Sequence, residues 1–319
     1  MRITGLGYYL PEQIETSESL APKIGKSVDW ILSRTGIRER RVSQIDVDEM
    51  GAIAAKKALN DGPPPDLILN ASGVPKQTLP DTSTFIQAQL GYEGIPSFSV
   101  HATCLSFLTA LKTANNFIVC GDYKRILIVS SDRGTCGRNF SEPESSSLLG
   151  DAAAAVLVEP ANESSESALL HWNMKTWPEG ATYTEVRGGG TNKHPQDPNT
   201  KDTDNLFTMN GPMIYKMARK HVYTMLNDDL KTIGINRKDI TLLVPHQASG
   251  LAVKAYVKYG KFNSEQVMDI ISYTGNCVAA SLPLALAIGF EESRFKRGDL
   301  VYLIGTGAGL SIASTLIRF

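Results

Sequence analysis

The order of secondary-structure patterns repeats between the two halves of the chain, and this repeat constrains the fold more than any other feature of the sequence. Each half contains a strand that runs into a turn, a segment that leads into a helix, and two strands joined by a glycine-containing turn. These patterns occupy residues 66–73, 97–104 and 125–158 in the first half and residues 241–250, 268–276 and 299–318 in the second. We therefore predict two half-folds of one architecture, residues 1–165 and residues 166–319.

Apolar β-rich runs alternate with helical patterns, which predicts an α/β fold with buried sheets. The predicted strands are 66–70, 97–100, 125–130 and 152–158, and the predicted helices are 49–60, 105–119, 212–227 and 252–259. A nearly apolar stretch, residues 277–290, is too short to span a bilayer and contains Pro283, so we expect a buried core helix there. Between Glu179 and Asn205 the composition shifts to Gly, Pro, Asn, Asp and Thr, which is typical of a long loop.

The overall composition excludes several classes of protein. Hydrophobic residues make up 42% of the 319 residues and the net charge is -1, so neither disorder nor nucleic-acid binding is expected. The segment after Met1 reads as a strand rather than a signal peptide, and no membrane segment is predicted, so we expect a cytoplasmic protein. The four cysteines are widely separated, which favours neither a disulfide framework nor a metal site.

Cys104 is the first candidate for chemistry. It follows the apolar run 97–100 and begins a helical pattern that continues through Leu111. Free amides and the dipole at a helix N-terminus favour negative charge, so we expect the pKa of this thiol to lie below the free value of about 8.5. The same amides would stabilise an oxyanion on an acyl group attached to the sulfur. The alternative is a buried cysteine that packs as a small hydrophobe.

His246 and Asn276 occupy similar strand-to-helix or turn-to-helix positions in the second half. His246 directly follows the strand predicted before it, and Asn276 lies in a Gly-Asn turn that opens a helix of small residues. Each alone is compatible with a structural role, as a strand-end histidine or a helix cap. On the repeat, Cys104 and Asn276 hold equivalent positions. The three residues together predict nucleophilic thioester chemistry, and they require no metal or bound cofactor.

The glycine-rich run 305–310 precedes the final predicted strand. It lacks the Lys-Ser/Thr ending of a phosphate loop, and a strand rather than a helix follows it. We expect this run to bring its backbone close to the site and to offer an amide to an oxyanion.

With these motifs in place, the chain resembles the β-ketoacyl-acyl-carrier-protein synthase III family of thiolase-fold condensing enzymes. The resemblance covers essentially the whole chain, and its motifs occur in the family's order. They are Trp30–Arg40, the turn at Cys104, Leu149–Ala155, Met209–Gly211, His246–Ala248, Gly275–Asn276 followed by Ala279–Ser281, and the closing glycine run.

The resemblance implies a thiolase-like five-layered αβαβα fold, a homodimer and acyltransferase activity. It implies acylation of Cys104 from acyl-CoA or acyl carrier protein, then decarboxylative condensation with a malonyl thioester to a β-ketoacyl product. His246 and Asn276 match the residues that donate hydrogen bonds to the malonyl thioester carbonyl, and the amides of Cys104 and Gly309 match the oxyanion hole. Positions matched to substrate binding are Trp30, Arg34, Leu79, Phe107, Asn210, Tyr215 and Ser249.

Four departures from the family pattern predict a specialised relative in fatty acid or secondary metabolism. The usual Asp-Arg-Gly-Thr run, whose arginine touches the adenine of coenzyme A, is replaced by Glu142–Ser145. Leu251 replaces an arginine associated with carrier-protein docking. Ser106 stands where glycine is usual, and Leu79-Pro80 replaces Phe-Pro near the partner's acyl pocket.

Two other activities and one non-catalytic role are alternatives to this interpretation. An acyltransferase would pass the acyl group from Cys104 to an amine or a hydroxyl without decarboxylation. A non-decarboxylating thiolase would need a second cysteine in the closing glycine run, whereas Cys277 stands beside Asn276. A non-catalytic subunit would not need the intact Cys, His and Asn.

Overall fold

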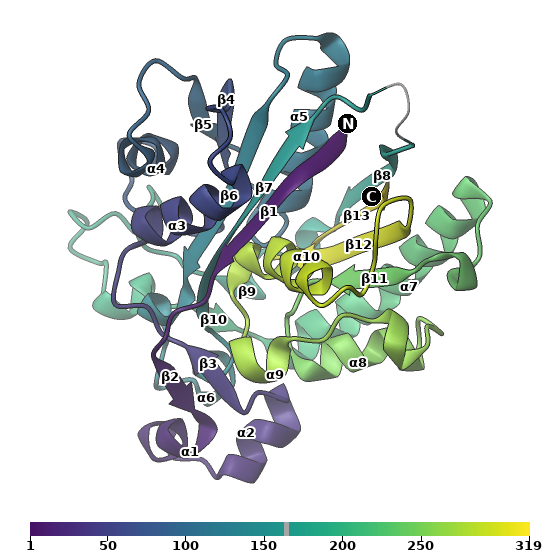
Figure 1. Ribbon diagram of the computed structural model, residues 1–319. Coiled ribbons are helices and arrows are strands. Elements are labelled where there is room, and N and C mark those ends of the chain that lie inside the picture. Colours follow the sequence, from purple (N-terminus) through teal and green to yellow (C-terminus); the bar gives the residue numbers. More distant parts are fainter. Residues whose placement is uncertain (163–165) are drawn as a thin grey trace.

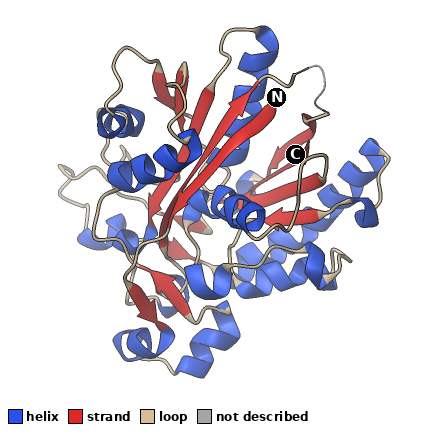
Figure 2. Cartoon of the chain, viewed as in Figure 1, coloured by secondary structure: helices blue, strands red, loops and turns tan. Residues whose placement is uncertain are grey.

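Two mixed β-sheets form the centre of the chain, which a computed structural model describes over residues 1–162 and 166–319 (Figures 1 and 2). The strands of the first sheet are β1 (Arg2–Tyr9), β4 (Leu67–Asn70), β5 (Ser97–Ser99), β6 (Ile126–Arg133) and β7 (Asp151–Glu159). Those of the second are β8 (Ala168–Thr176), β11 (Leu242–Pro245), β12 (Leu300–Gly307) and β13 (Ser311–Arg318). Two short ribbons pair β2 (Ile14–Thr16) with β3 (Glu39–Arg41) and β9 (Thr184–Glu185) with β10 (Thr208–Met209).

The two sheets share one topology. Their orders are β1-β7-β6-β4-β5 and β8-β13-β12-β11. In the first sheet β4 pairs parallel with β6, while β6 and β1 pair antiparallel with β7. The second sheet repeats this with β11, β12, β13 and β8. The counterpart of β5 is reduced to an isolated bridge between Leu243 and Val267. The predicted duplication of the fold is therefore confirmed.

Alternation of side chains along the strands creates five layers. Leu67 and Leu69 of β4 face the core between the sheets, whereas Ile68 packs with Met50 and Ile86 on the outer side. The outer layers are α3 (Val47–Leu59) with α4 (Thr82–Leu90), and α7 (Gly211–Ile233) with α8 (Gly250–Lys258). The central layer is α5 (Ser106–Cys120) with α10 (Ser281–Glu291), and Figure 1 shows α10 between the sheets. The layer order is that of the predicted αβαβα fold.

The remaining helices are short. They are α1 (Ser17–Leu20), α2 (Val28–Thr35), α6 (Pro143–Ser146) and α9 (Ile271–Thr274), with 3₁₀ helices at Ala21–Ile24, Gly134–Gly137, Pro178–Gly180, Asp202–Asn205, Arg237–Asp239, Ser264–Gln266 and Val278–Ala280.

The predicted strands and helices are present, with shifted ends. The helix predicted from 212 to 227 continues to Ile233, where Gly234 ends it in the left-handed conformation. The predicted loop over 179–205 is largely irregular, although β9 pairs with β10 and makes part of it an ordered wall. The boundary predicted between residues 165 and 166 adjoins residues 163–165, which lie outside the described part of the chain, so the two domain ranges stay a prediction. Within the described residues, no helix is long and apolar enough to cross a membrane.

Candidate active site

Cys104 lies in a tight turn just before α5. Thr103 adopts a left-handed φ of 51°, which is uncommon for a residue with a branched side chain. The hydroxyl of Ser106 accepts the N–H of Ala102 at 3.0 Å and donates to the carbonyl of Thr103 at 2.7 Å. These contacts hold the turn so that α5 begins at Ser106, two residues after the thiol.

The expected low pKa of Cys104 is wrong for the free enzyme. Burial, with the negative charge of Asp132, raises the pKa of this thiol to about 12, although the backbone N–H groups of Cys104 and Ala308 act in the opposite direction. The helix N-terminus is present, but the thiol is only partly exposed and loses more from desolvation than it gains from nearby amides. The free enzyme therefore holds Cys104 as a neutral thiol.

His246 follows β11 at the carboxyl end of the second sheet. Its N–H donates to the carbonyl of Ile304 at 2.8 Å, which continues the pairing of β11 with β12. The imidazole is buried, and this burial lowers its pKa to about 4, so it is neutral near pH 7. Its Nδ1 atom is buried and has no hydrogen-bond partner among the described residues.

Asn276 lies in the turn between α9 and α10. Its Oδ1 accepts the N–H of Val278 at 2.9 Å, and its Nδ2 donates to the carbonyl of Ala248 at 3.3 Å, two residues from His246. Its backbone exchanges hydrogen bonds with Leu148 and Gly150. The side-chain amide is thereby held beside the segment that follows the histidine.

Gln247 is a positioning residue that the sequence reasoning missed. Its Nε2 donates to the carbonyls of Pro245 and Met268 at 2.9 and 3.1 Å, and its Oε1 accepts the N–H of Ile270 at 3.0 Å. This buried amide ties the end of β11 to the segment that leads to Asn276. Its position directly after His246 was the available signal.

The glycines of β12 allow the turn at Cys104 and the histidine to approach each other. A Cβ on Gly305 would lie 3.0 Å from a Leu105 methyl and 3.1 Å from the His246 Cβ. A Cβ on Gly307 would lie 2.6 Å from the Thr103 hydroxyl. Only glycine leaves room for both contacts. The closing glycine run thus lies between the two halves of the site, as expected from the sequence.

The closing glycine run places the backbone amide of Ala308 against the Cys104 sulfur. The amide of Gly309, one residue later, stays a prediction for the oxyanion hole. Gly309 adopts a φ of 125°, a value open to glycine and rarely adopted by other residues.

The expected equivalence of Cys104 and Asn276 is also wrong. In the second half, the N–H of Cys277 donates to the Ser281 hydroxyl at 3.0 Å and Val278 has a φ of 50°, which repeats the contacts of Ala102, Thr103 and Ser106. The counterpart of Cys104 is therefore Ala279, and Asn276 lies three residues earlier. The residues before the two helices are similar in type, so aligning the two halves by sequence placed Cys104 opposite Asn276 instead of Ala279, an offset of three residues.

Asp132 is a further residue that the sequence reasoning left without a role. Its carboxylate is buried and accepts the N–H groups of Gly73 and Val74 at 2.8 and 2.9 Å and that of Ala280 at 3.0 Å. Burial raises the pKa of Asp132 to about 7 despite these hydrogen bonds. Asp132 thus connects β6 to backbone N–H groups of both halves of the fold, and its charge acts on the Cys104 thiol.

Two of the predicted substrate-binding residues, Trp30 and Arg34, lie on α2, beside the start of α8. Trp30 is half-buried and Arg34 is exposed. The backbones of Gly36 and Gly250 touch, because a Cβ on either would lie 3.0 Å from the Cα of the other. Ser249, which caps α8 by accepting the N–H of Ala252 at 3.2 Å, is therefore next to the end of α2.

The other predicted substrate-binding residues fall in different environments. Tyr215 lines a cavity between α7 and α8 that also includes His246. The Asn210 side chain caps α7 by accepting the N–H of Met213 at 3.3 Å. Phe107 is fully buried in the core between the sheets, and Leu79 is 80% exposed on the loop before α4.

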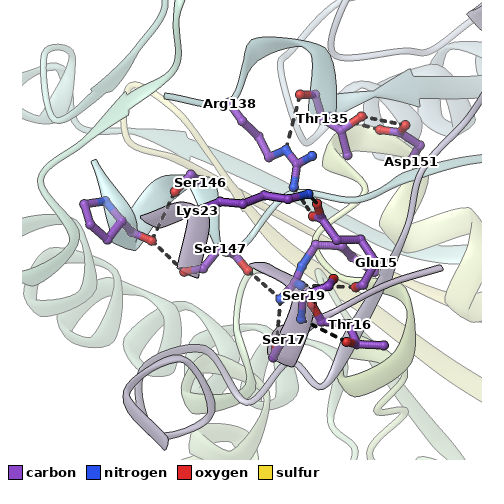
Figure 3. Close-up of polar contacts among 12 residues, drawn as sticks. Glu15, Thr16, Ser17, Ser19, Lys23, Thr135, Arg138, Ser146, Ser147 and Asp151 are labelled. Atoms are coloured by element: carbon purple, nitrogen blue, oxygen red, sulfur yellow. Dashed lines mark hydrogen bonds and ion pairs between the residues drawn. The ribbon is translucent and has the colours of Figure 1, made fainter. Parts of the chain in front are cut away.

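A network of ion pairs and hydrogen bonds centred on Glu15 joins the segment before α1 to the rest of the chain (Figure 3). The Glu15 carboxylate binds Lys23 at 2.8 Å and also Arg138, whose guanidinium donates to the Thr135 carbonyl at 3.4 Å. The Thr135 hydroxyl in turn donates to Asp151 at 2.7 Å. This chain of contacts joins the segment before α1 to the start of β7.

Arg40 completes the network from the other side. It is fully buried and donates to the Glu15 carbonyl at 3.2 Å, the Ser17 hydroxyl at 3.1 Å and the Ser147 carbonyl at 3.2 Å. The start of α1 is thus connected to the segment around α6.

Comparisons with known proteins agree with this geometry. A family model described as 3-oxoacyl-[acyl-carrier-protein (ACP)] synthase III matches residues 98–177, and one for the C terminal of the same synthase matches residues 230–319. A β-ketoacyl-[acyl-carrier-protein] synthase III of Bradyrhizobium diazoefficiens is 32% identical over 99% of this chain and 98% of its own. The chain belongs to the β-ketoacyl-acyl-carrier-protein synthase III family.

Solved structures place this synthase III among condensing enzymes of the thiolase fold. The synthase III of Aquifex aeolicus VF5 matches with a TM-score of 0.90 and 29% identity, covering 100% of this chain and 99% of that one. The priming β-ketosynthase of the R1128 polyketide pathway matches with a TM-score of 0.90 and 25% identity, covering 99% and 95%. This chain is thus a synthase III-like condensing enzyme of the acyltransferase class.

Proposed function

We propose that this synthase III takes an acyl group from an acyl thioester of coenzyme A or acyl carrier protein onto Cys104. It then condenses that group with a malonyl thioester, with loss of carbon dioxide, to give a β-ketoacyl thioester. The proposal rests on one observation: three chemical groups, contributed by both halves of the chain, form one site. These are the enclosed thiol of Cys104 against the Ala308 amide, the buried neutral imidazole of His246, and Asn276 beside it.

In the acylation step, the Cys104 sulfur attacks the thioester carbonyl and the donor thiol leaves. The sulfur gives up its proton in the course of this exchange, because its pKa of about 12 keeps it protonated beforehand. The amides of Cys104 and Ala308 are suitably placed to hold the oxyanion of the tetrahedral intermediate.

In the condensation step, the bond between the malonyl Cα and its carboxylate breaks and the electron pair forms an enolate. His246 and Asn276 donate hydrogen bonds to the enolate oxygen, and a neutral imidazole suits this role because it keeps one N–H donor. The enolate carbon attacks the acyl carbonyl, the C–S bond breaks, and the released Cys104 thiolate takes up a proton from solvent, its first proton having left with the donor thiol.

The departures from the family pattern at Glu142 and Leu251 lead us to propose a specialised acyl donor. The backbone N–H of Met209 donates to Glu142 at 3.2 Å, so an acidic side chain is fixed where the family carries the arginine that touches coenzyme A. Leu251, 49% exposed, replaces the second arginine. The first change removes a contact to the adenine of coenzyme A, and the second removes a charge associated with carrier-protein docking.

We propose that His246→Ala and Asn276→Ala separate the two half-reactions. Each variant should still form acyl-Cys104, because the thiol turn and the Ala308 amide remain. Each should lose about 10²- to 10³-fold in the condensation step, since one donor to the enolate is missing. Intact-mass detection of acyl-Cys104, paired with release of labelled carbon dioxide from a malonyl thioester, measures both steps in one preparation.

The double variant should lose less than the product of the single losses, because both side chains serve one oxygen. Cys104→Ala is the control without acylation. If His246→Ala blocks acylation as completely as Cys104→Ala, the histidine acts as base for the thiol. If the acylated wild type never releases carbon dioxide from a malonyl thioester, transfer to an amine or hydroxyl replaces the condensing proposal.

A further inference from the structure

A short loop, residues 308–310, joins β12 to β13 and carries the Ala308 amide that contacts the Cys104 sulfur. At the other end of the loop, Leu310 exchanges two hydrogen bonds with Trp177, the residue that follows β8. The N–H of Trp177 donates to the Leu310 carbonyl at 2.8 Å, and the N–H of Leu310 donates to the Trp177 carbonyl at 3.1 Å. In the described part of the chain, the loop makes no other hydrogen bond between backbone groups. Trp177 therefore holds the loop from outside the hairpin.

The segment that follows Trp177 packs against the same loop. A Cβ on Gly180 would lie 2.9 Å from the Leu310 nitrogen and 3.2 Å from the Met217 sulfur. Glycine thus lets the turn Pro178–Gly180 fit between the loop and α7. Leu310 itself is fully buried against residues of α7. The position of the loop therefore depends on how this segment is seated on α7.

The side chain of Trp177 fixes the segment on α7. Its indole stacks on the imidazole of His221, with 4.1 Å between the ring centroids and 23° between the ring planes. Met217 and His221 are four residues apart, so they lie on one face of the helix. Burial, with a contribution from Lys220, lowers the pKa of His221 below its ordinary value of 6.5, so the contact joins two neutral rings near pH 7. A continuous set of contacts thus runs from α7 through the indole to the 308–310 loop.

We propose that Trp177 is a positioning residue that holds the Ala308 amide against the acyl carbonyl on Cys104. This role rests on the proposed acyl transfer, in which that amide stabilises an oxyanion. An oxyanion forms on this carbonyl twice, when the thiol takes the acyl group and when the enolate attacks it. The enolate that decarboxylation leaves is assigned to His246 and Asn276 instead. Loss of the indole should therefore slow both acyl-transfer steps and leave decarboxylation unchanged.

This separation of steps predicts a by-product. After carbon dioxide has left, the enolate either attacks the acyl carbonyl or takes a proton from water and becomes an acetyl thioester. Slower attack gives protonation more time. An enzyme whose 308–310 loop is displaced should therefore form less β-ketoacyl thioester and more acetyl thioester for each carbon dioxide released.

The experiment compares variants of the full-length enzyme. Trp177→Leu removes the ring and keeps an apolar side chain, whereas Trp177→Phe keeps a ring that can stack. His221→Ala removes the partner ring. Trp172→Leu is the matched control, because this second tryptophan also lies on β8 but packs against the core between the sheets.

Three quantities are measured for each variant. The first is the rate of acyl-Cys104 formation over a range of acyl-CoA concentrations, with an acyl-CoA that acylates the wild type. The second is the release of labelled carbon dioxide from malonyl-CoA by the acyl-enzyme. The third is the ratio of acetyl-CoA to β-ketoacyl-CoA among the products.

Trp177→Leu should lower the maximal acylation rate about tenfold and leave the half-saturating acyl-CoA concentration within about twofold, because a displaced amide weakens the transition state and not donor binding. Carbon dioxide release should stay within about twofold of the wild type, while the share of acetyl-CoA rises. Trp177→Phe should restore most of the acylation rate, and Trp172→Leu should match the wild type throughout. His221→Ala should lose about threefold in acylation and add nothing to Trp177→Leu in the double variant, since both remove one stack.

Equal losses in acylation and carbon dioxide release for Trp177→Leu, or the same losses for Trp172→Leu, would indicate a general structural role and overturn the proposal. If Trp177→Leu fails to fold, His221→Ala decides, because it keeps the indole; an unchanged acylation rate in this variant would overturn the proposal. A wild-type enzyme that acylates Cys104 and never releases carbon dioxide is a different result. It would contradict the proposed condensation, whereas the acylation rates would still test the role of Trp177.

Discussion

At the residue scale, the thiol of Cys104 and the carboxyl of Asp132 are the two groups most altered by the fold. Both are enclosed, and their pKa values rise to about 12 and about 7. Burial is the main cause of both shifts, and the negative charge of Asp132 further disfavours the Cys104 thiolate. The resting enzyme therefore protects its nucleophile as a neutral thiol until a substrate carbonyl is in place.

We predict that alkylation of Cys104 in the free enzyme accelerates about tenfold for each unit of pH between 7 and 9, without a plateau. The reason is that a pKa of about 12 leaves the thiolate fraction proportional to hydroxide throughout this range. Peptide mapping after timed iodoacetamide treatment distinguishes Cys104 from the exposed Cys120 and Cys136. A plateau near pH 8 would show that the thiolate is already stabilised before substrate binds.

Asp132→Asn provides the matched variant for this measurement. Loss of the negative charge should lower the pKa of Cys104 and speed its alkylation at a fixed pH. The amide cannot accept from all of Gly73, Val74 and Ala280, so unfolding should become easier by about 1 to 3 kcal/mol.

At the element scale, close backbone contacts decide where the catalytic turns lie. The turn that carries Asn276 runs beside the start of β7, where Gly150 donates its N–H to the Asn276 carbonyl at 3.0 Å. A Cβ on Gly150 would lie 2.2 Å from the Thr274 carbonyl oxygen, which is backbone and cannot rotate away. The position of the asparagine thus depends on a strand from the other half of the chain.

Gly150→Ala should therefore displace the turn at 274–276. We expect a loss of stability of about 1 to 3 kcal/mol and a larger loss in condensation than in acylation. Gly137→Ala is the control, because a Cβ there meets nothing within 4 Å. Thermal unfolding and the two half-reactions measure the effects; equal losses in both half-reactions would show that the displacement also reaches the Cys104 turn.

At the scale of the whole molecule, the ionic network around Glu15 holds β2 and the 3₁₀ helix Ala21–Ile24 to the body of the enzyme. Burial raises the pKa of Glu15, but hydrogen bonds and charges from Lys23 and Arg138 outweigh this and hold the value below its usual range. The depressed pKa means that the network contributes its stability above the unfolded pKa and loses it as the pH falls through the folded value.

Glu15→Gln should destabilise the protein by about 3 kcal/mol at pH 7, because the buried guanidinium of Arg138 loses its counter-charge. The difference from the wild type should shrink as the pH falls below the ordinary value of 4.5. Denaturant unfolding at pH 7 and pH 4 tests this. A difference that grows at the lower pH would contradict the charge argument.

We also predict a homodimer paired through β5. This strand is one of the two edge strands of the five-stranded sheet, and it carries Phe98 at 39% exposure. An exposed apolar edge strand is a template for pairing with another chain. Light scattering should give twice the mass of one chain, and Phe98→Lys should shift the mass towards that of the monomer. A fully active wild-type monomer at micromolar concentration would exclude this arrangement.

The sequence by itself determined the elements and the chemistry-bearing residues. The apolar runs along 66–70 and 125–130, the helical spacing of 49–60 and 105–119, and the order of turns are local patterns, so they predicted an α/β fold of two similar halves. The five αβαβα layers were implied by the family resemblance. Cys104, His246 and Asn276 were recognisable because their positions relative to the strands and turns are also local properties.

Only the tertiary structure decided how these residues meet. The pKa of Cys104 depends on its burial and on the charge of Asp132, and the amide at its sulfur comes from Ala308 in the other half of the chain. The counterpart of Cys104 in that half is Ala279. The cavity between α7 and α8 beside His246 likewise exists only where two helices and β12 come together. Desolvation, close backbone contact and cavity shape all arise between segments distant in the chain, and local periodicity carries no information about them.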